Sequence, residues 1–169
     1  IEGVETGGEG AAAGPSLNTL LATADVAAGE KVFAKCMACH TINQGGANGI
    51  GPNLWATLGE AIAVGKAGFA FSDALKKVGG TWTFEQMDHW LASPRDFAPG
   101  TKMSFAGLSK PQDRANIIAY MNAQGSNLPL PAADAEPEAA AEAGAGADNA
   151  AAPAEGDNAA APAADAAAE

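Results

Sequence analysis

The only two cysteines of this 169-residue chain lie three positions apart, and a histidine directly follows the second. Cys36, Cys39 and His40 form the pattern C-x-x-C-H, which is the attachment signature of c-type haem. Two thiols on one helical turn can each add to a vinyl group of the porphyrin, and the adjacent imidazole can then reach the iron. The pattern predicts one haem, bound covalently through thioethers at both cysteines, with His40 as an axial ligand.

Three other kinds of site also use closely spaced cysteines, and each fits this chain less well. A thioredoxin-like redox pair requires strands and helices in alternation, which the sequence does not indicate. A disulfide across two intervening residues closes too small a loop to stabilise the fold much. A structural zinc site requires a second pair of Cys or His ligands, which the sequence lacks. Haem attachment is therefore the preferred interpretation.

A covalently bound haem still needs a sixth iron ligand, for which the sequence offers a methionine and a histidine. Met87 and Met121 have apolar neighbours at helical spacing, which favours core packing, and Met37 lies inside the attachment motif. Met103 lies in the Pro/Gly segment PGTKMSFAG, which has no helical periodicity, and this favours ligation. His89, on the polar side of an expected short helix, is the alternative and would give a bis-histidine haem.

Three main helices are expected around this motif, and no strand signal extends beyond a few residues. Each helix begins at a recognisable capping pattern. The patterns are Asp25 for the first helix, Thr83 with Gln86 for the second, and Ser109 with Gln112 for the third, which ends near Gly125. A briefer helix is expected after Ser72 and is closed by Gly79 and Gly80.

Long Gly/Pro-rich stretches at 43–68 and 94–108 separate the expected helices. Loops of this length in a small domain need something else to hold them. A large apolar cofactor would do so. The sequence therefore predicts an all-α fold with three main helices and long loops around one covalently attached haem.

The charge of the chain, −11 overall, is concentrated at its two ends. Residues 1–24 hold three acids and residues 131–169 hold nine, with no base in either, whereas residues 25–130 hold eight acids and all nine Lys/Arg. Segments rich in Ala, Gly, Pro and acids bury too little apolar surface to offset their ordering entropy. We expect a flexible Gly/Glu-rich linker at 1–24, a haem-binding domain at 25–130 and a disordered Ala/Pro/acidic tail at 131–169.

No run of about 18 apolar residues occurs, so the sequence predicts no membrane span. The first residue is Ile1 rather than Met, which suggests processing and leaves a lost leader or membrane anchor open.

Several segments of the chain follow the order found in one protein family. They are ADVAAGEKVFAKCMACHTI, GIGPNLW, GFAFSDALK, GTWTFEQM, LASPRDFAPGTKMSFAGL and RANIIAYM. They resemble class I cytochromes c, especially the mitochondrial and alphaproteobacterial type, over residues 25–124. The Gly/Glu-rich segment before them is more loosely similar to the linker of membrane-anchored bacterial cytochromes c of the c-552 and c-y type.

The resemblance implies roles for particular residues at the iron. Cys36 and Cys39 carry the thioethers of haem c, and His40 and Met103 are the axial ligands. The Pro52 carbonyl accepts a hydrogen bond from the His40 ring, which fixes the tautomer of the imidazole.

The resemblance also implies a set of haem contacts around the propionates. Trp82 and Thr101 fall where the family hydrogen-bonds a propionate, and Ser72 matches a position of similar use. Two positions depart from the mitochondrial pattern, since Glu60 stands near the place of an arginine and Phe71 replaces a tyrosine. Both changes remove a donor from the propionate region.

The function implied by the resemblance is one-electron transfer in the bacterial periplasm. The protein would carry electrons in a respiratory chain, from a cytochrome bc1-type donor to a terminal oxidase or reductase. We expect a monomer with no nucleic-acid partner, and no enzyme activity, because a saturated iron has no open site for substrate. Two alternatives stay open. One is a peroxidase-like or gas-binding haem enzyme with an open sixth site, and the other is a redox subunit of a larger respiratory complex.

A ring of basic residues around the exposed haem edge is expected to steer acidic redox partners. Its predicted members are Lys31, Lys35, Arg95, Lys102 and Lys110. The acidic tail could screen the same residues at low salt.

Overall fold

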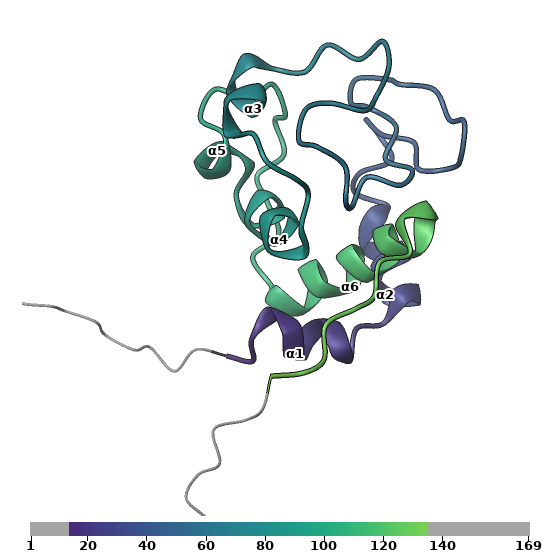
Figure 1. Ribbon diagram of the computed structural model, residues 1–169, viewed down its shortest axis with the longest axis vertical. Helices are drawn as coiled ribbons and strands as arrows, with labels where there is room; N and C mark the ends of the chain where they lie inside the picture. The colour runs from purple at the N-terminus through teal and green to yellow at the C-terminus, as the bar shows by residue number, and fades with distance from the viewer. Residues whose placement is uncertain (1–13, 135–169) are drawn as a thin grey trace, which may run out of the picture. The chain divides into compact units, whose positions relative to one another are not determined.

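The computed structural model describes residues 14–134 (Figure 1). Its helices are α1 (Leu17–Ala22), α2 (Val26–Phe33), α3 (Asp73–Val78), α4 (Phe84–Ala92), α5 (Pro94–Phe97) and α6 (Pro111–Met121), and α6 continues into η1 (Asn122–Ser126). Within residues 14–134 there is no strand, only an isolated antiparallel bridge between Ala61 and Thr81. The predicted all-α fold is confirmed.

Helices α2 and α6 cross closely, and a glycine makes the crossing possible. A Cβ atom at Gly29 would lie 2.0 Å from the backbone oxygen of Asn116. As predicted, the Asp25 side chain caps α2, accepting hydrogen bonds from the backbone of Ala27 and Ala28. The Asp25 N–H donates to the Asn116 side chain across the crossing at 3.0 Å. The residue that caps α2, Asp25, therefore also helps to hold α2 against α6.

Helices α4 and α6 supply much of the core. The Thr83 hydroxyl caps α4 by accepting from the Gln86 N–H, as predicted, and α4 buries Met87, Trp90 and Leu91. On α6, Ile117 and Ile118 are 0% exposed. These buried faces position the helices around the space that the long loops enclose.

The predicted cap of the last helix is wrong. The N-cap residue of α6 is Lys110, and no side chain caps the helix there. Pro111 occupies the first turn, where its missing N–H leaves one fewer donor to satisfy. The Gln112 side chain, predicted to pair with Ser109, donates instead to Asn116 at 2.9 Å.

Helix α1 differs from the linker that the sequence predicted at 1–24. Ser16 caps it by accepting from the Thr19 N–H, and Leu21 is 1% exposed in the core. The helix packs against α6 (Figure 1), and burial of its leucine side chains stabilises a turn that is too short to persist alone. The remaining parts of the expected linker and tail, 1–13 and 135–169, lie outside the described residues.

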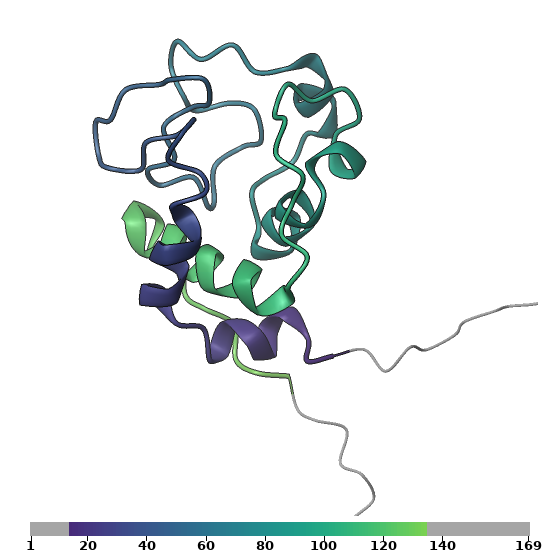
Figure 2. The same cartoon turned by 180° about the vertical axis from the view of Figure 1, so that it is seen from behind.

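Two groups of loops and short helices lie on the side of α6 that faces away from α1. The loops at 41–71 lie on one side, and α3, α4, α5 and the segment 98–108 lie on the other, in both views (Figures 1 and 2). Helix α3 begins after Ser72, as predicted, and Ser72 caps it by accepting from the Leu75 N–H. It is followed by Gly79, whose φ of +65° suits glycine. The ends of both loop groups therefore face a common space.

Candidate functional site

A cavity of about 610 Å³ opens between these two loop groups. The two cysteines and His40 line it from the turn between α2 and the first loop group, and Met103 lines it from the second group. Helices α2, α4 and α6 add an apolar wall that includes Phe33, Met87, Trp90, Leu91, Ile117 and Met121. An apolar cavity of this size with a few convergent polar groups suits a flat cofactor.

The C-x-x-C-H segment forms a single turn at the end of α2. The backbone N–H groups of Cys39 and His40 both donate to the Cys36 carbonyl, at 3.0 and 2.9 Å. Both thiols are free and line the cavity. Burial raises the pKa of the Cys36 thiol, Cys39 raises it further and Lys35 lowers it. The turn therefore presents two neighbouring thiols to the same cavity.

The His40 ring is oriented by the loop that follows the motif. Its Nδ1 lies 2.8 Å from the Pro52 carbonyl oxygen, as the sequence resemblance implied. Because a carbonyl can only accept, Nδ1 carries the proton and Nε2 is free to bind a metal. Burial lowers the pKa of His40, which favours the neutral imidazole that metals bind, while the Pro52 hydrogen bond raises it. Gly51 is required, since a Cβ there would lie 2.3 Å from His40 Cε1.

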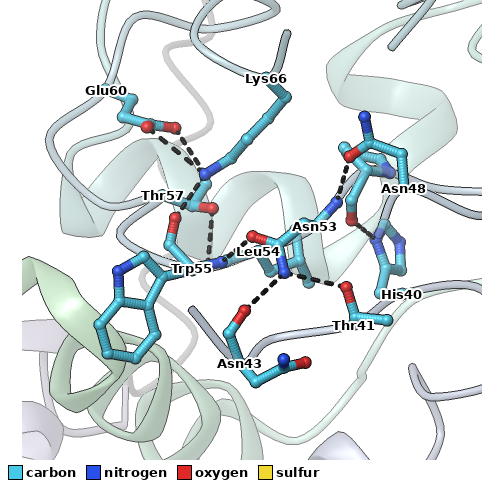
Figure 3. A network of polar contacts seen from close by, with 11 residues as sticks. His40, Thr41, Asn43, Asn48, Asn53, Leu54, Trp55, Thr57, Glu60 and Lys66 are labelled. Atoms are coloured by element: carbon cyan, nitrogen blue, oxygen red, sulfur yellow. Dashed lines mark hydrogen bonds and ion pairs between the residues drawn. The ribbon is translucent and has the colours of Figure 1, made fainter. Parts of the chain in front are cut away.

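A buried asparagine holds this loop together (Figure 3). Asn53 donates from its side chain to Thr41 Oγ1 and to the Asn43 carbonyl, both at 2.9 Å. Its side-chain oxygen accepts from the Trp55 N–H at 3.1 Å, and its own N–H donates to Asn48 at 2.9 Å. The sequence analysis missed Asn53, whose only signal was a polar residue inside the Gly/Pro-rich segment GPNL.

On the opposite loop, Met103 is half-buried at the cavity wall. Its N–H donates to Thr101 Oγ1 at 3.3 Å, and Thr101 N–H donates to the Ala98 carbonyl at 2.9 Å. The alternative ligand His89 is exposed and does not line the cavity. Met37 is 66% exposed. Of these three side chains, the structure brings only Met103 to the same cavity as His40.

The predicted propionate-binding residues Ser72, Trp82 and Thr101 also line the cavity. Ser72 Oγ already accepts from the Leu75 N–H at 3.2 Å as the cap of α3. Trp82 is 6% exposed and lines the cavity, and its indole nitrogen is not one of the fully buried polar atoms that lack a partner within residues 14–134. Because no hydrogen bond within the described residues uses the indole N–H, it is available to donate to a polar group of a bound cofactor.

The five predicted docking residues are all exposed, but they do not all border the cavity. Lys35 and Lys102 line its mouth, one beside each loop group. Lys31, Arg95 and Lys110 lie outside the cavity wall. The sequence analysis missed a further cation in the wall, Lys66, which pairs with Glu60.

Comparison with known proteins identifies the family. A family model described as cytochrome c matches residues 26–125, which is more than half of the chain. This chain belongs to the cytochrome c family.

Individual relatives agree with this assignment. The cytochrome is 48% identical over 128 residues to a cytochrome c homolog of Bradyrhizobium diazoefficiens, covering 75% of this chain and 70% of that one. It is 50% identical over 101 residues to the cytochrome c-type cyt cy of Rhodobacter capsulatus, covering 59% of this chain and 49% of that one. Among solved structures it is similar to cytochrome cH from Methylobacterium extorquens, with a TM-score of 0.56 and 48% identity, covering 59% of this chain and 98% of that one.

The predicted resemblance to class I cytochromes c and the predicted cofactor are both confirmed. Membership of the cytochrome c family implies a covalently attached haem c, and the cavity fits it. Two free thiols, an imidazole with Nδ1 engaged and an unpartnered indole N–H all line one apolar space. The family also supports a role in electron transport.

Some of the curated relatives are longer than the matched region. The chain spans 58% of a cytochrome c homolog from Rickettsia felis and about half of the Rhodobacter protein. In the part of the chain that the structure describes, no helix is both long enough and apolar enough to cross a membrane.

Proposed function

We propose that this cytochrome c is a one-electron carrier whose haem iron is ligated by His40 and Met103. The observation that carries the proposal is that these two side chains come from separate loops and line the same apolar cavity as both thiols. The bound haem c supplies the one-electron couple. With His40 and Met103 both bound to it, the iron would have no open site for substrate, so the protein would transfer electrons rather than catalyse a reaction.

The chain contributes position and environment to this couple. The thiols of Cys36 and Cys39 would hold the haem through thioethers just beyond the end of α2. The Pro52 carbonyl holds the ligand imidazole in one tautomer. The apolar wall from α2, α4 and α6 excludes water, which is one of the levers that set a haem potential. Trp82 is the proposed donor to a propionate, and Ser72 and Thr101 are proposed to lie beside it.

The proposed partners are a cytochrome bc1-type donor and a terminal oxidase or reductase of a periplasmic respiratory chain. The mouth of the cavity supports docking of a redox protein, because exposed Lys35 and Lys102 flank it and Ile50 and Val64 are 82% and 61% exposed there. Lysines around an apolar centre favour fast, salt-sensitive association with acidic partners.

Other parts of the proposal rest on the sequence. Lys31, Arg95 and Lys110 are proposed as outer members of the docking surface. The nine acids of residues 131–169 are proposed to compete for the same cations at low salt. We further propose a monomer, held at the membrane only through its partners or through an anchor of a longer precursor.

Replacing Met103 by Ala tests the ligation. We expect the weak near-infrared sulfur-to-iron band of the oxidised protein to disappear and the reduction potential to fall, because the thioether raises it. Met37→Ala is the matched control, since that side chain is 66% exposed and should leave both quantities unchanged. A wild-type spectrum in Met103→Ala would refute the assignment, and loss of the low-spin spectrum in His89→Ala would support the bis-histidine alternative.

A further inference from the structure

The wall of the haem cavity contains an ion pair that no ligand assignment uses. Lys66 Nζ lies 3.1 Å from Glu60 Oε2, and it also donates to the backbone carbonyl of Trp55 (Figure 3). The Lys66 side chain is only 10% exposed and that of Glu60 is 29% exposed. Both residues line the cavity.

The burial of this Lys66–Glu60 ion pair calls for a physical explanation. Removing two charges from water costs more than their mutual attraction usually returns, so a buried pair seldom stabilises a fold more than apolar packing would. An ammonium group has three N–H donors. Trp55 and Glu60 take two of those donors among the described residues, which leaves one for a group in the cavity.

The unpartnered indole N–H of Trp82 belongs to the same wall. Two backbone hydrogen bonds of 2.9 Å join the segments, from the Trp82 N–H to the Glu60 carbonyl and from the Gly59 N–H to the Trp82 carbonyl. The wall therefore carries two donors that are available to an acceptor in the cavity, one of them cationic. The group that fits is a carboxylate, and a haem carries two of them as propionates.

We propose that Lys66 binds a haem propionate together with the Trp82 indole, and that Glu60 positions the Lys66 ammonium group. In the holoprotein, one ammonium would then lie between two carboxylates, that of Glu60 and that of the propionate. The proposal rests on the proposed function only through the placement of the haem in this cavity. It does not depend on Met103 or on any redox partner.

The charge has a consequence for the haem. A cation near the porphyrin disfavours the oxidised iron, which carries the extra positive charge, and so raises the reduction potential. At 10% exposure the Lys66 charge is screened by water much less than that of an exposed lysine. Loss of the Lys66 charge should therefore lower the potential, and loss of the Glu60 charge should raise it.

The test compares Lys66→Gln with Lys76→Gln in the full-length holoprotein. Lys76 is a matched control because it also pairs with an acid, Asp73 at 3.8 Å, but its side chain is 55% exposed and does not line the cavity. We expect Lys66→Gln to shift the propionate-bending bands in resonance Raman spectra and to lower the potential. Lys66→Arg, which keeps a cationic donor, should restore both. Lys76→Gln should leave the bands unchanged.

A role limited to tying the loop to Trp55 gives a different result. In that case Lys66→Gln would lower the melting temperature but leave the propionate bands and the potential as in Lys76→Gln, and the proposal would be overturned. Should Lys66→Gln fail to mature, Glu60→Gln retains the lysine. It should raise the potential and shift the same Raman bands, and unchanged values would equally overturn the proposal. The near-infrared methionine band should persist in all these variants, so a failure of ligation is seen separately.

Discussion

The loop that carries His40 and the loop that carries Met103 face the same cavity but are built differently. In the first, Asn53 makes side-chain hydrogen bonds to three neighbours, and further backbone bonds of 2.8 Å run from Gly51 to Cys39 and from Leu54 to Thr41. In the second, the described hydrogen bonds of residues 98–108 lie toward its two ends. Near the start they run from Ala98 to Pro94, from Thr101 to Ala98 and from Met103 to Thr101 at 3.3 Å, and at the end they run from Leu108 to Leu91 and from Arg114 to the Leu108 carbonyl.

This difference in hydrogen bonding predicts that the His40 loop is more rigid than the Met103 loop. Polar cross-links fix the His40 loop even before its contacts with a cofactor are counted. The Met103 loop depends more on packing against the cavity contents, and segments with few hydrogen bonds open locally at lower free energy. The histidine side should therefore act as the rigid reference, and the methionine side should be the part that adjusts.

The largest expected effect comes from filling the space beside the histidine. Gly51→Ala places a Cβ 2.3 Å from His40 Cε1, so the ring must move away from its position. We expect little or no mature protein, measured as haem content per chain after expression with the haem-attachment machinery.

Gly100→Ala is the matched change on the other loop. A Cβ at Gly100 would meet nothing closer than Ala74 at 3.7 Å, although its φ of +94° is unfavourable for alanine. The expected cost is about 1 kcal/mol of unfolding free energy, with haem attachment retained. Equal haem content in the two variants would contradict the contrast between the loops.

A smaller effect is expected from removing the polar network. Asn53→Ala deletes the acceptor of the Trp55 N–H and the donor to Thr41 and Asn43. Leaving buried groups unpaired should lower the unfolding free energy of the holoprotein by roughly 2–3 kcal/mol, measured by guanidinium denaturation. Thr101→Val on the Met103 loop loses one long hydrogen bond and should cost less than about 1 kcal/mol. A larger loss in Thr101→Val would reverse the assignment of the rigid side.

The smallest effect concerns which side meets a redox partner. Lys35 borders the cavity beside the cysteines and Lys102 borders it beside Met103. Neutralising either to Gln should slow association with a solubilised acidic oxidase by roughly two- to fivefold at low salt, and the difference should vanish at high salt. Stopped-flow rates across ionic strength measure it. If only one variant responds, docking is confined to that loop, and if neither responds, the lysines are not part of the interface.

Local chemistry was predictable from the sequence, and long-range pairing was not. The spacing of Cys36, Cys39 and His40 and the caps at Asp25 and Thr83 are read within a few residues, so they could be predicted. Helix α1 is stabilised by burial of Leu21 against distant residues rather than by its own propensity. The prediction of a capping box for α6 failed because Pro111 lies in the first turn and has no N–H for a side chain to cap.

Two polar side chains of the loops at 41–71 were missed for the same reason. Asn53 reaches back 12 positions to Thr41, and Lys66 reaches back 11 positions to Trp55. Such contacts exist only after the loops have folded over one another. The expectation that long Gly/Pro loops need a cofactor to hold them is thus only part of the account, because the His40 loop also holds itself through Asn53.

The close crossing of α2 and α6 at Gly29 bears on how the chain folds. Asp25 and Asn116, which meet there, are 91 positions apart in the sequence. Bringing such distant segments together carries a loop-closure entropy that must be met before the contact returns any stability, so a fold of this kind is slow to nucleate from a bare chain. A porphyrin already joined to Cys36, one turn beyond α2, would offer Ile117 and Met121 of α6 an apolar surface to collapse onto. Haem attachment would then come before the contact between α2 and α6 and would promote it.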